Sequence, residues 1–323
     1  MISTQPFPEM NMDVKLDKIK VLCLSLWYPL SMSRYFEKAL RHRIDVDLLT
    51  CGVYTGSWIP WLGGVNLPEK YAIPPDIILP FRNDVGSVNY DLVRAMLPQG
   101  WVPDIVLNID AGICWKYKPS EGMVVHVATD PHALNYDHQR SISDKFFNMQ
   151  KVYSKQGDIY LPYAYSKYDF YPEELALEDE PVDAVLIGMP YENRVRWMDE
   201  LRKRGLKVIF ENGPVFDEAR HLYNRGKIGL NYSSMDDLNC RAFELPAMKL
   251  CPVMNRVTDM EEFFIPNYHY LEFTDLGGAV EQVLWAKNHS EGAEKIAENA
   301  YKAVQGHDYD ARVAQILKEC GYW

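Results

Sequence analysis

The sequence predicts an α/β protein with two domains, each built around a parallel sheet, and three observations lead to this. The chain has 323 residues, and single domains commonly hold ~100–200 residues, so two cores are expected. Short apolar runs alternate with amphipathic stretches from end to end, as in repeated strand–helix–strand units. The alternation is interrupted near residues 161–174 (LPYAYSKYDFYPEE), where two prolines lie among aromatic residues. We therefore place the domain boundary in this segment.

The first series of elements precedes residue 165. Its expected strands are short, apolar and bounded by turn residues, as strands buried on both faces of a parallel sheet are. A helix is expected at 31–43, where apolar residues recur at helical spacing. Residues 54–80 are rich in glycine, proline and tryptophan, and we expect a long loop there. The expected strands are 20–26, 45–49, 104–109 and 123–128.

The second series repeats the same alternation after residue 165. Helices are expected where apolar residues share one face, and strands where a short apolar run ends at turn residues. Two such series in tandem predict two Rossmann-like domains. The expected strands are 182–187, 206–210, 227–232, 252–255 and 270–273, and the expected helices are 194–204, 216–224, 243–250, 276–288, 291–304 and 310–319.

Composition limits the possible partners and compartments. The formal net charge of −11 lowers the expectation of nucleic-acid binding, which needs a basic surface. Six cysteines occur without Cys-x-x-Cys pairs, which argues against a zinc site or a disulfide framework and favours a reducing cytoplasm. No apolar run approaches the ~20 residues of a membrane span. Residues 1–18 lack the apolar core of a signal peptide, so we interpret them as an untargeted leader.

Residues 239–255 (NCRAFELPAMKLCPVMN) resemble the donor-binding motif of GT-B glycosyltransferases, in which Arg-x-Phe-Glu opens a helix and a Pro-Val strand follows. The resemblance is greatest to the CgeB-like, spore-coat-maturation-type family. The resemblance covers the C-terminal half well. In the N-terminal half only the arrangement of the predicted elements agrees. Other segments that agree with this family in order are LPYA at 161–164, IGMPYENR at 187–194, YNRGKIGLNYS at 223–233 and HDYDARVAQI at 307–316.

The resemblance implies two Rossmann-like domains that face each other across a cleft. Residues 1–165 would form an acceptor domain and 166–305 a nucleotide-sugar donor domain, with the terminal segment 306–323 packed back on the first domain. The implied enzyme transfers a hexosyl or pentosyl group from a nucleotide-sugar to a hydroxyl acceptor: a glycan, a small molecule or modified DNA. Two residues depart from the family pattern. Asp236 stands where many retaining members have the first of two glutamates, and Lys249 where a small residue is common.

The predicted donor site lies in the second domain. Glu244 is expected to accept hydrogen bonds from both ribose hydroxyls, although an acid at a helix start is also favoured by the helix dipole alone. Arg241 and Arg194 are expected near the diphosphate, with exposed surface arginines as the alternative interpretation. Gly188 either allows close approach of the donor or only ends a strand. The predicted donor-binding residues are Gly188, Arg194, Ser233, Arg241, Phe243 and Glu244.

The chemistry of the leaving group suggests how such a site works. Departure of a nucleoside diphosphate develops negative charge on its phosphate oxygens. Arginines and a helix N-terminus that are already in place stabilise this charge. No metal ion is required if these groups suffice, so we predict a metal-independent reaction with no cofactor besides the nucleotide-sugar.

The acceptor side offers fewer signals. Asp130 and His132 follow the expected strand at 123–128, at the end where ligands of parallel α/β sheets bind. Either could take the proton of an acceptor hydroxyl, and the two stay alternatives, since Asp130 could instead cap the next segment. Asp110, after strand 104–109, is a further candidate. Two tryptophans of the 54–80 loop could stack on a sugar or base, although such residues are more often loop anchors: Trp58 and Trp61.

Two other functions compete with this interpretation. A viral-type DNA-base glycosyltransferase, acting on hydroxymethyl-pyrimidines, would share the donor domain but need a basic groove on the first domain. The sequence offers a short cluster there, Lys38 with RHR at 41–43, within an acidic chain. A non-catalytic small-molecule binding protein would also have two such domains. The missing signal peptide and the Arg-x-Phe-Glu segment favour an enzyme.

Overall fold

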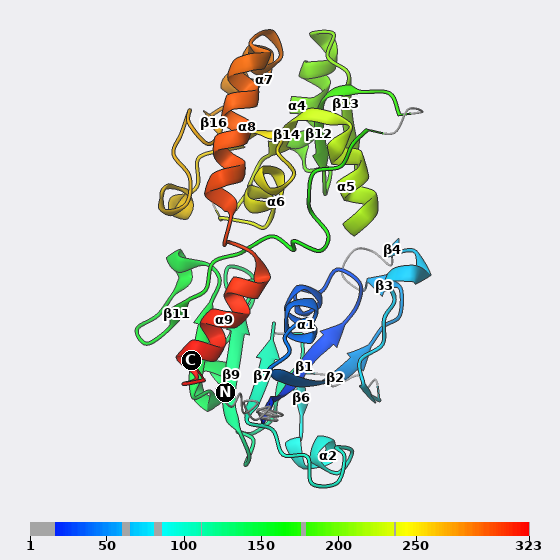
Figure 1. The fold of residues 1–323 in the computed structure, drawn as a ribbon, viewed down its shortest axis with the longest axis vertical. Helices are drawn as coiled ribbons and strands as arrows, with labels where there is room; N and C mark the ends of the chain where they lie inside the picture. The colour runs from blue at the N-terminus through cyan, green and yellow to red at the C-terminus, as the bar shows by residue number, and fades with distance from the viewer. Residues whose placement is uncertain are drawn as a thin grey trace, which may run out of the picture.

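The computed structural model contains two parallel sheets joined by two chain crossings (Figure 1). In the first sheet the strand order is β11-β10-β9-β7-β1-β2-β5, and in the second it is β13-β12-β14-β15-β16. This arrangement confirms the predicted fold class. We call the first sheet with its helices the first domain and the second sheet with its helices the second domain. The structure describes residues 17–59, 65–80, 86–110, 112–175, 179–235 and 237–322.

The first domain contains the longest strands of the molecule. Strands β7 and β9 are buried almost along their whole length, which explains their continuous apolar sequences. Its sheet strands are β1 (Ile19–Trp27), β2 (Val46–Tyr54), β5 (Ile77–Leu79), β7 (Ile105–Ile109), β9 (Met123–Ala128), β10 (Lys145–Asn148) and β11 (Ile159–Tyr160). Short pairs are β3 (Trp58–Ile59) with β4 (Val65–Asn66) and β6 (Ser87–Val88) with β8 (Cys114–Trp115), and the helices are α1 (Ser33–Arg41), α2 (Tyr90–Arg94) and α3 (Asp137–Ile142).

The second domain alternates strands and helices more regularly. Helix α6 starts at Arg241 and ends at Ala247, earlier at both ends than the expected 243–250. Lys249 adopts a positive φ of 57° and turns the chain into the next strand. The strands are β12 (Val182–Ile187), β13 (Val208–Glu211), β14 (Gly226–Asn231), β15 (Cys251–Asn255) and β16 (Leu271–Phe273), and the helices are α4 (Glu192–Lys203), α5 (Phe216–Asn224), α6 (Arg241–Ala247), α7 (Leu276–Asn288) and α8 (Ser290–Val304).

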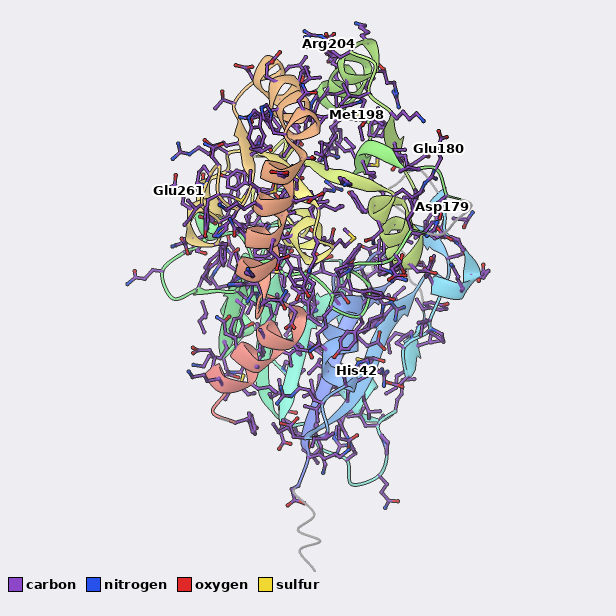
Figure 2. The ribbon with its side chains drawn as sticks, turned by 45° about the horizontal axis from the view of Figure 1, so that its top comes forward. His42, Asp179, Glu180, Met198, Arg204 and Glu261 are labelled. Atoms are coloured by element: carbon purple, nitrogen blue, oxygen red, sulfur yellow. The ribbon has the colours of Figure 1, made fainter. Side chains whose placement is uncertain are left out.

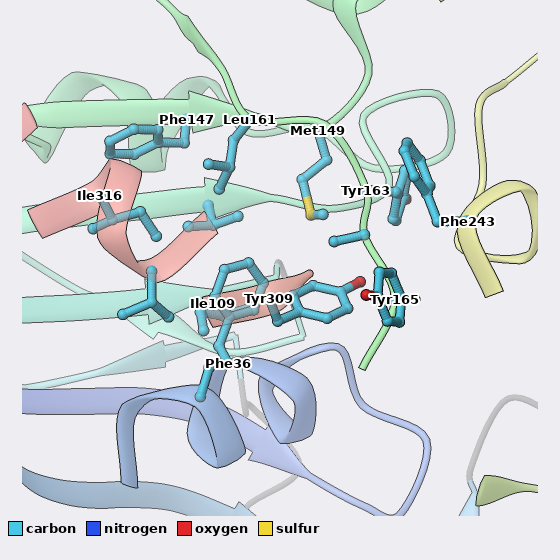
Figure 3. Packing of buried hydrophobic residues seen from close by; sticks show 14 of the residues in the cluster. Phe36, Ile109, Phe147, Met149, Leu161, Tyr163, Tyr165, Phe243, Tyr309 and Ile316 are labelled. Carbon is cyan, nitrogen blue, oxygen red and sulfur yellow. The ribbon is translucent and has the colours of Figure 1, made fainter. Parts of the chain in front are cut away.

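The last helix, α9 (Tyr309–Glu319), returns to the first domain (Figure 1). Figure 3 shows Tyr309 and Ile316 of α9 beside Phe36 of α1, and the rings of Phe36 and Tyr309 are 5.2 Å apart between centroids. The two chain crossings between the domains are hydrogen-bonded to each other, because the Tyr165 N–H donates to the His307 carbonyl at 3.3 Å. In addition, Arg312 Nε of α9 donates to the Pro162 carbonyl at 2.7 Å. The terminal segment is therefore tied both to the first domain and to the linker.

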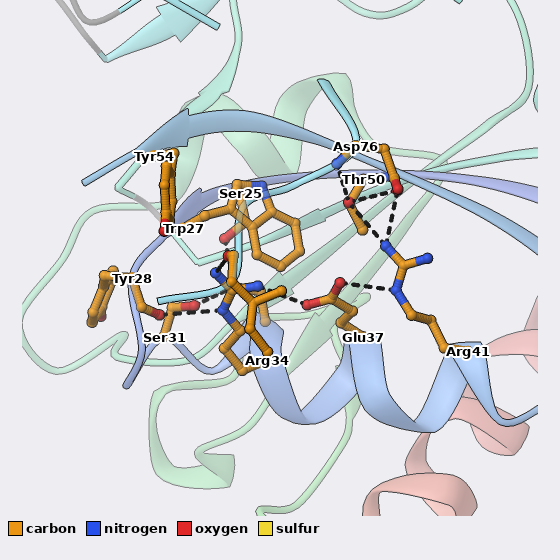
Figure 4. Close-up of polar contacts among 12 residues, drawn as sticks. Ser25, Trp27, Tyr28, Ser31, Arg34, Glu37, Arg41, Thr50, Tyr54 and Asp76 are labelled. Atoms are coloured by element: carbon orange, nitrogen blue, oxygen red, sulfur yellow. Dashed lines mark hydrogen bonds and ion pairs between the residues drawn. The ribbon is translucent and has the colours of Figure 1, made fainter. Parts of the chain in front are cut away.

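A buried polar network holds α1 on the first sheet (Figure 4). The Arg34 guanidinium lies 4.8 Å from the Trp27 ring centroid and donates to Glu37 at 2.9 Å. Glu37 also accepts from Arg41, whose other nitrogen donates to Asp76 at 2.9 Å. Buried charges are costly unless paired in this way. The network fixes the position of α1, which carries residues that face the second domain.

The outer surface of the second domain is charged. Figure 2 shows Glu180, Arg204 and Glu261 on the outside, whereas Met198 of α4 is fully buried against the sheet. Among the helices of the described ranges, none is long and apolar enough to cross a membrane.

Candidate active site between the two sheets

A cavity of about 500 Å³ lies between the two domains. Strands of both sheets lead into it at their carboxyl ends: Leu30 follows β1, Asp130 follows β9, Gly188 follows β12 and Asn212 follows β13. In parallel α/β sheets this edge is where ligands bind, because the strand-to-helix loops leave the sheet there. The cavity is therefore the candidate active site.

Gly188 forms the turn between β12 and α4. Its φ of 148° is one that residues with a side chain rarely adopt. A Cβ atom here would lie 2.8 Å from Arg241 Nη2 and 3.1 Å from Arg194 Nη1. Glycine is thus required both by the backbone conformation and by the two guanidinium groups that approach it.

Arg194 lies in the first turn of α4 and is 7% exposed. Its Nη2 and Nε donate to the Tyr232 carbonyl at 2.7 and 3.3 Å, and its Nη1 donates to the Met189 carbonyl at 3.1 Å. Within the described ranges it has no carboxylate partner. Burial, and then the neighbouring Arg241, lower the pKa of Arg194 to about 10. A buried cation that lacks a counter-ion favours an incoming anion.

Arg241 is the first residue of α6 and lines the same end of the cavity. Its Nε donates to Tyr223 Oη at 3.0 Å and its Nη1 to Asn231 Oδ1 at 3.3 Å. Burial lowers the pKa of Arg241, but Tyr223 and Glu244 outweigh this effect and raise it. Each guanidinium has five N–H donors, so both arginines keep donors for a ligand. Together with the uncapped N-terminus of α4, they form a site suited to a diphosphate.

Glu244 lines the cavity one helical turn after Arg241. Within the described part of the chain, its carboxylate accepts no hydrogen bond. Burial raises the pKa of Glu244 to about 7, with Arg241 acting in the opposite direction and Asp169 in the same one. A carboxylate without hydrogen-bond partners at the wall of a cavity can accept two hydrogen bonds from a diol.

The first domain places Asp130, but not His132, on the cavity wall. Asp130 accepts a hydrogen bond from Thr129 Oγ1 at 3.2 Å, and burial together with Asp110 raises its pKa. The His132 ring faces Gln150, with Nδ1 and Oε1 3.1 Å apart. Gln150 in turn donates to Asp237 of the second domain at 3.3 Å. His132 thus belongs to a polar chain that links the domains.

Other predicted site residues lie outside the cavity lining. Phe243 is fully buried in the core that joins the domains, where its ring is 5.5 Å from that of Phe264 between centroids. The Ser233 hydroxyl donates to Asp237, which does line the cavity. Asp110, with a φ of 70°, accepts from Tyr136 Oη at 3.2 Å. Trp58 is 41% exposed and does not line the cavity, and two further positions fall outside the described residues: Trp61 and Asp236.

Several cavity residues were not predicted from the sequence. Tyr223 accepts from Arg241 and from the Ile187 N–H at 3.2 Å, so it positions the glycine turn. Tyr35 of α1 also lines the cavity, although the sequence marked it only as part of an apolar helix face. The loop of residues 212–215 follows β13 and lines the cavity too. Its Asn-Gly-Pro sequence at 212–214 was a signal that could have been used, because it follows a strand in the same way as Gly188 does.

The sequence contains two Asp-x-Asp segments, at 45–47 and 308–310, and carboxylates are ligands that divalent metal ions prefer. Neither lines the cavity. Asp45 pairs with Arg43 at 2.7 Å, and Asp47 accepts from Trp101 at 2.8 Å. Asp308 caps α9, and Asp310 accepts from Tyr168. These carboxylates have structural partners, and metal independence stays a prediction.

Comparisons with known proteins bear on the fold. A family model described as glycosyl transferase-like matches residues 174–318, and no curated protein matches the sequence. A glycosyltransferase from Rickettsia africae is similar with a TM-score of 0.62 at 11% identity, covering 94% of this chain and 98% of its own. Sucrose-phosphate synthase from Thermosynechococcus elongatus has a TM-score of 0.60 at 12% identity, with coverage of 94% and 98%. HepE from Anabaena in complex with UDP has a TM-score of 0.59 at 12% identity, with coverage of 94% and 100%.

These likenesses extend over both domains and concern the fold, because the identities are low. The residues that the family model matches include the second sheet with its helices and nearly all of α9. They also include Arg194, Arg241 and Glu244. The narrower resemblance to the CgeB-like family stays a prediction. The chain therefore has the GT-B fold, and the match to the glycosyl transferase-like family model lies in its second domain and α9.

Proposed function

We propose that the protein is a glycosyltransferase that moves a sugar from a nucleotide-sugar donor to a hydroxyl acceptor. The observation that carries this proposal is the grouping of two guanidinium groups without carboxylate partners and one unbonded carboxylate on the second-domain wall of one cavity. The pair Arg194 and Arg241 suits a diphosphate, and Glu244 suits a ribose diol. The UDP complex of HepE, a protein of the same fold, is consistent with such a donor.

The proposed reaction divides the work between the domains. Residues 166–305 bind the donor, and residues 1–165 with the terminal segment bind the acceptor. The acceptor oxygen attacks the anomeric carbon, the bond from this carbon to the diphosphate oxygen breaks, and the acceptor proton passes to Asp130. The two arginines stabilise the charge left on the diphosphate. In this proposal the arginines take the place of a metal ion.

A thermal-shift screen tests the proposal directly. UDP-, GDP-, TDP- and ADP-sugars are added in turn to the protein at millimolar concentration. A ligand that binds the folded state raises its stability by about 2.7 kcal/mol at one hundred times its Kd. We expect a clear rise in melting temperature with at least one nucleotide and release of nucleoside diphosphate in its presence. A flat response to all four would contradict a nucleotide-sugar donor.

Glu244→Gln is expected to weaken nucleoside diphosphate binding by about 10- to 100-fold, because hydrogen bonds to a charged group are worth ~1.5–3 kcal/mol. The same change should alter the pH dependence of stability. The folded-state pKa of about 7 exceeds the ordinary 4.5, so folding takes up a proton between these values. The wild-type free energy of unfolding therefore falls as pH rises through this window, and the variant should lose this fall.

Isothermal titration with the nucleotide and thermal melts between pH 5 and pH 8 measure the two effects. Glu298→Gln serves as the control, since Glu298 is exposed and pairs with Lys249 away from the cavity. Wild-type nucleotide affinity in Glu244→Gln would remove this residue from the donor site.

A further inference from the structure

Among the described residues, the wall that the first domain contributes to the cavity carries three aliphatic side chains, two tyrosine rings and one carboxylate. On the proposed function, this wall faces the donor and receives the acceptor, because the donor groups all lie on the second domain. The Tyr163 hydroxyl is already used, since it donates to the Thr129 carbonyl. The first-domain residues on this wall are Leu30, Tyr35, Ile59, Leu67, Asp130 and Tyr163.

The order of the strands arranges these residues along one sheet edge. Asp130 follows β9 and Leu30 follows β1, and β7 lies between these strands. Neighbouring strands are ~4.8 Å apart, so the two residues are separated by about 10 Å along the edge. Ile59 and Leu67 come after β2, on the far side of β1, and Leu30 packs against the core cluster that contains them. A polar end and a continuous apolar surface thus lie side by side.

The charges of the cavity are divided in the same way. Its described cations, Arg194 and Arg241, belong to the second domain and are assigned to the donor phosphates. No lysine, arginine or histidine of the described first-domain residues lines it, and Lys38 of α1 pairs with Asp169. Asp110 and Asp237 act with Asp130 as like charges and raise its pKa. An anionic acceptor would meet carboxylates and no free cation at this end.

We infer that the acceptor is an uncharged hydroxyl compound with an apolar body, of which the hydroxyl lies at Asp130 and the body against Leu30. This inference rests on the proposed function. Among the described residues of this wall, only the Asp130 carboxylate and the Tyr35 hydroxyl could replace the hydrogen bonds that a carbohydrate acceptor makes to water. A nucleic acid would be repelled by Asp130 and its neighbours. The wall therefore selects against both classes.

The first experiment compares three acceptors with the nucleotide-sugar that gives the largest thermal shift. The probes, assayed at about pH 6 so that the phenol stays uncharged, are 4-methylumbelliferone as an apolar hydroxyl compound, maltose as a neutral polar one and glucose 6-phosphate as an anion. We expect kcat/KM for 4-methylumbelliferone to exceed that for the other two by at least about 10-fold, since even one methylene in an apolar pocket is worth ~10–200-fold. A higher value for maltose or glucose 6-phosphate overturns the inference.

The second experiment uses Leu30→Ser, which removes apolar surface from a half-buried position at the end of β1. The KM for 4-methylumbelliferone should rise about 10-fold, whereas the Kd of the nucleotide-sugar should not change. Leu92→Ser is the matched control, because Leu92 lies on α2 and is 59% exposed away from the cavity. An equal loss of donor affinity in Leu30→Ser means that the wall covers the donor, and it overturns the inference.

The two proposals fail in different ways. A wild-type protein that binds and hydrolyses a nucleotide-sugar but does not prefer 4-methylumbelliferone keeps the proposed function and loses the acceptor class. A wild-type protein that neither binds nor hydrolyses any of the four nucleotide-sugars loses both. Melting temperatures of the variants confirm that each is folded before its kinetics are compared.

Discussion

Replacing Asp130 by asparagine is expected to lower turnover by about 10²- to 10⁴-fold, the contribution of a positioned general base. Asparagine keeps the shape of the side chain but cannot take up the acceptor proton. Donor affinity should stay unchanged, because Asp130 lies on the wall opposite Gly188, Arg241 and Glu244. Burial and Asp110 raise the pKa of Asp130, so wild-type kcat/KM should fall as pH drops through this raised pKa. The variant should lose that acid limb.

Turnover of Asp130→Asn is measured at saturating donor, with donor affinity determined separately by titration. His132→Ala is the comparison, because His132 does not line the cavity and should retain most of the activity. Near-normal turnover in both variants would exclude a side-chain base at this position. In a reaction that retains configuration, the donor phosphate could take the proton instead, and Asp110 would be the next residue to test.

Gly188→Ala is expected to lower kcat/KM by at least about 100-fold, since a displacement of 1 Å at a reacting site can cost that much. The added Cβ would lie 2.8 Å from Arg241 Nη2, which must shift, and 3.1 Å from Arg194 Nη1, which must give by a few tenths of an ångström. The φ of 148° adds strain, and such strain costs about 1–3 kcal/mol of stability. The variant should therefore lose diphosphate binding as well as some stability.

Gly205→Ala separates these two effects. Gly205 also has a positive φ, of 79°, but a Cβ there would meet no atom within 4 Å. This control should lose stability and keep its activity. Titration with the nucleoside diphosphate and chemical denaturation measure both quantities for each variant. Unchanged nucleotide affinity in Gly188→Ala would show that the turn does not bind the phosphates.

The strands at the centre of both sheets could be predicted because buried parallel strands have apolar side chains on both faces. β7, β9 and β12 lie within one residue of their expected positions. β10 (Lys145–Asn148) and the edge strand β11 (Ile159–Tyr160) were missed, because such short strands acquire their conformation from pairing with β9 and with each other. The expected loop at 54–80 likewise contains β3, β4 and β5.

The donor side of the site could be predicted where its residues share one helical turn. Arg241 and Glu244 are three residues apart, and successive residues are rotated by ~100° in a helix, so the two lie on one face. Phe243 lies about 200° from Arg241 on the same count and faces the core, where the structure places it. If the helix had been predicted to begin at Arg241 rather than at Phe243, the same count would have assigned Phe243 to the core and Arg241 with Glu244 to the site.

By itself the sequence determined which residues follow each buried strand, because apolar periodicity and turn residues are local properties. Only the tertiary structure decided which of these residues share a cavity. Asp130 and His132 are two residues apart, yet the fold of the first domain turns His132 toward Gln150, while Asp130 reaches a cavity that the second domain completes. The cavity is lined from three helices, by Tyr35 of α1, Tyr223 of α5 and Arg241 at the start of α6. Such contacts depend on how whole domains pack, and no local pattern in the sequence encodes them.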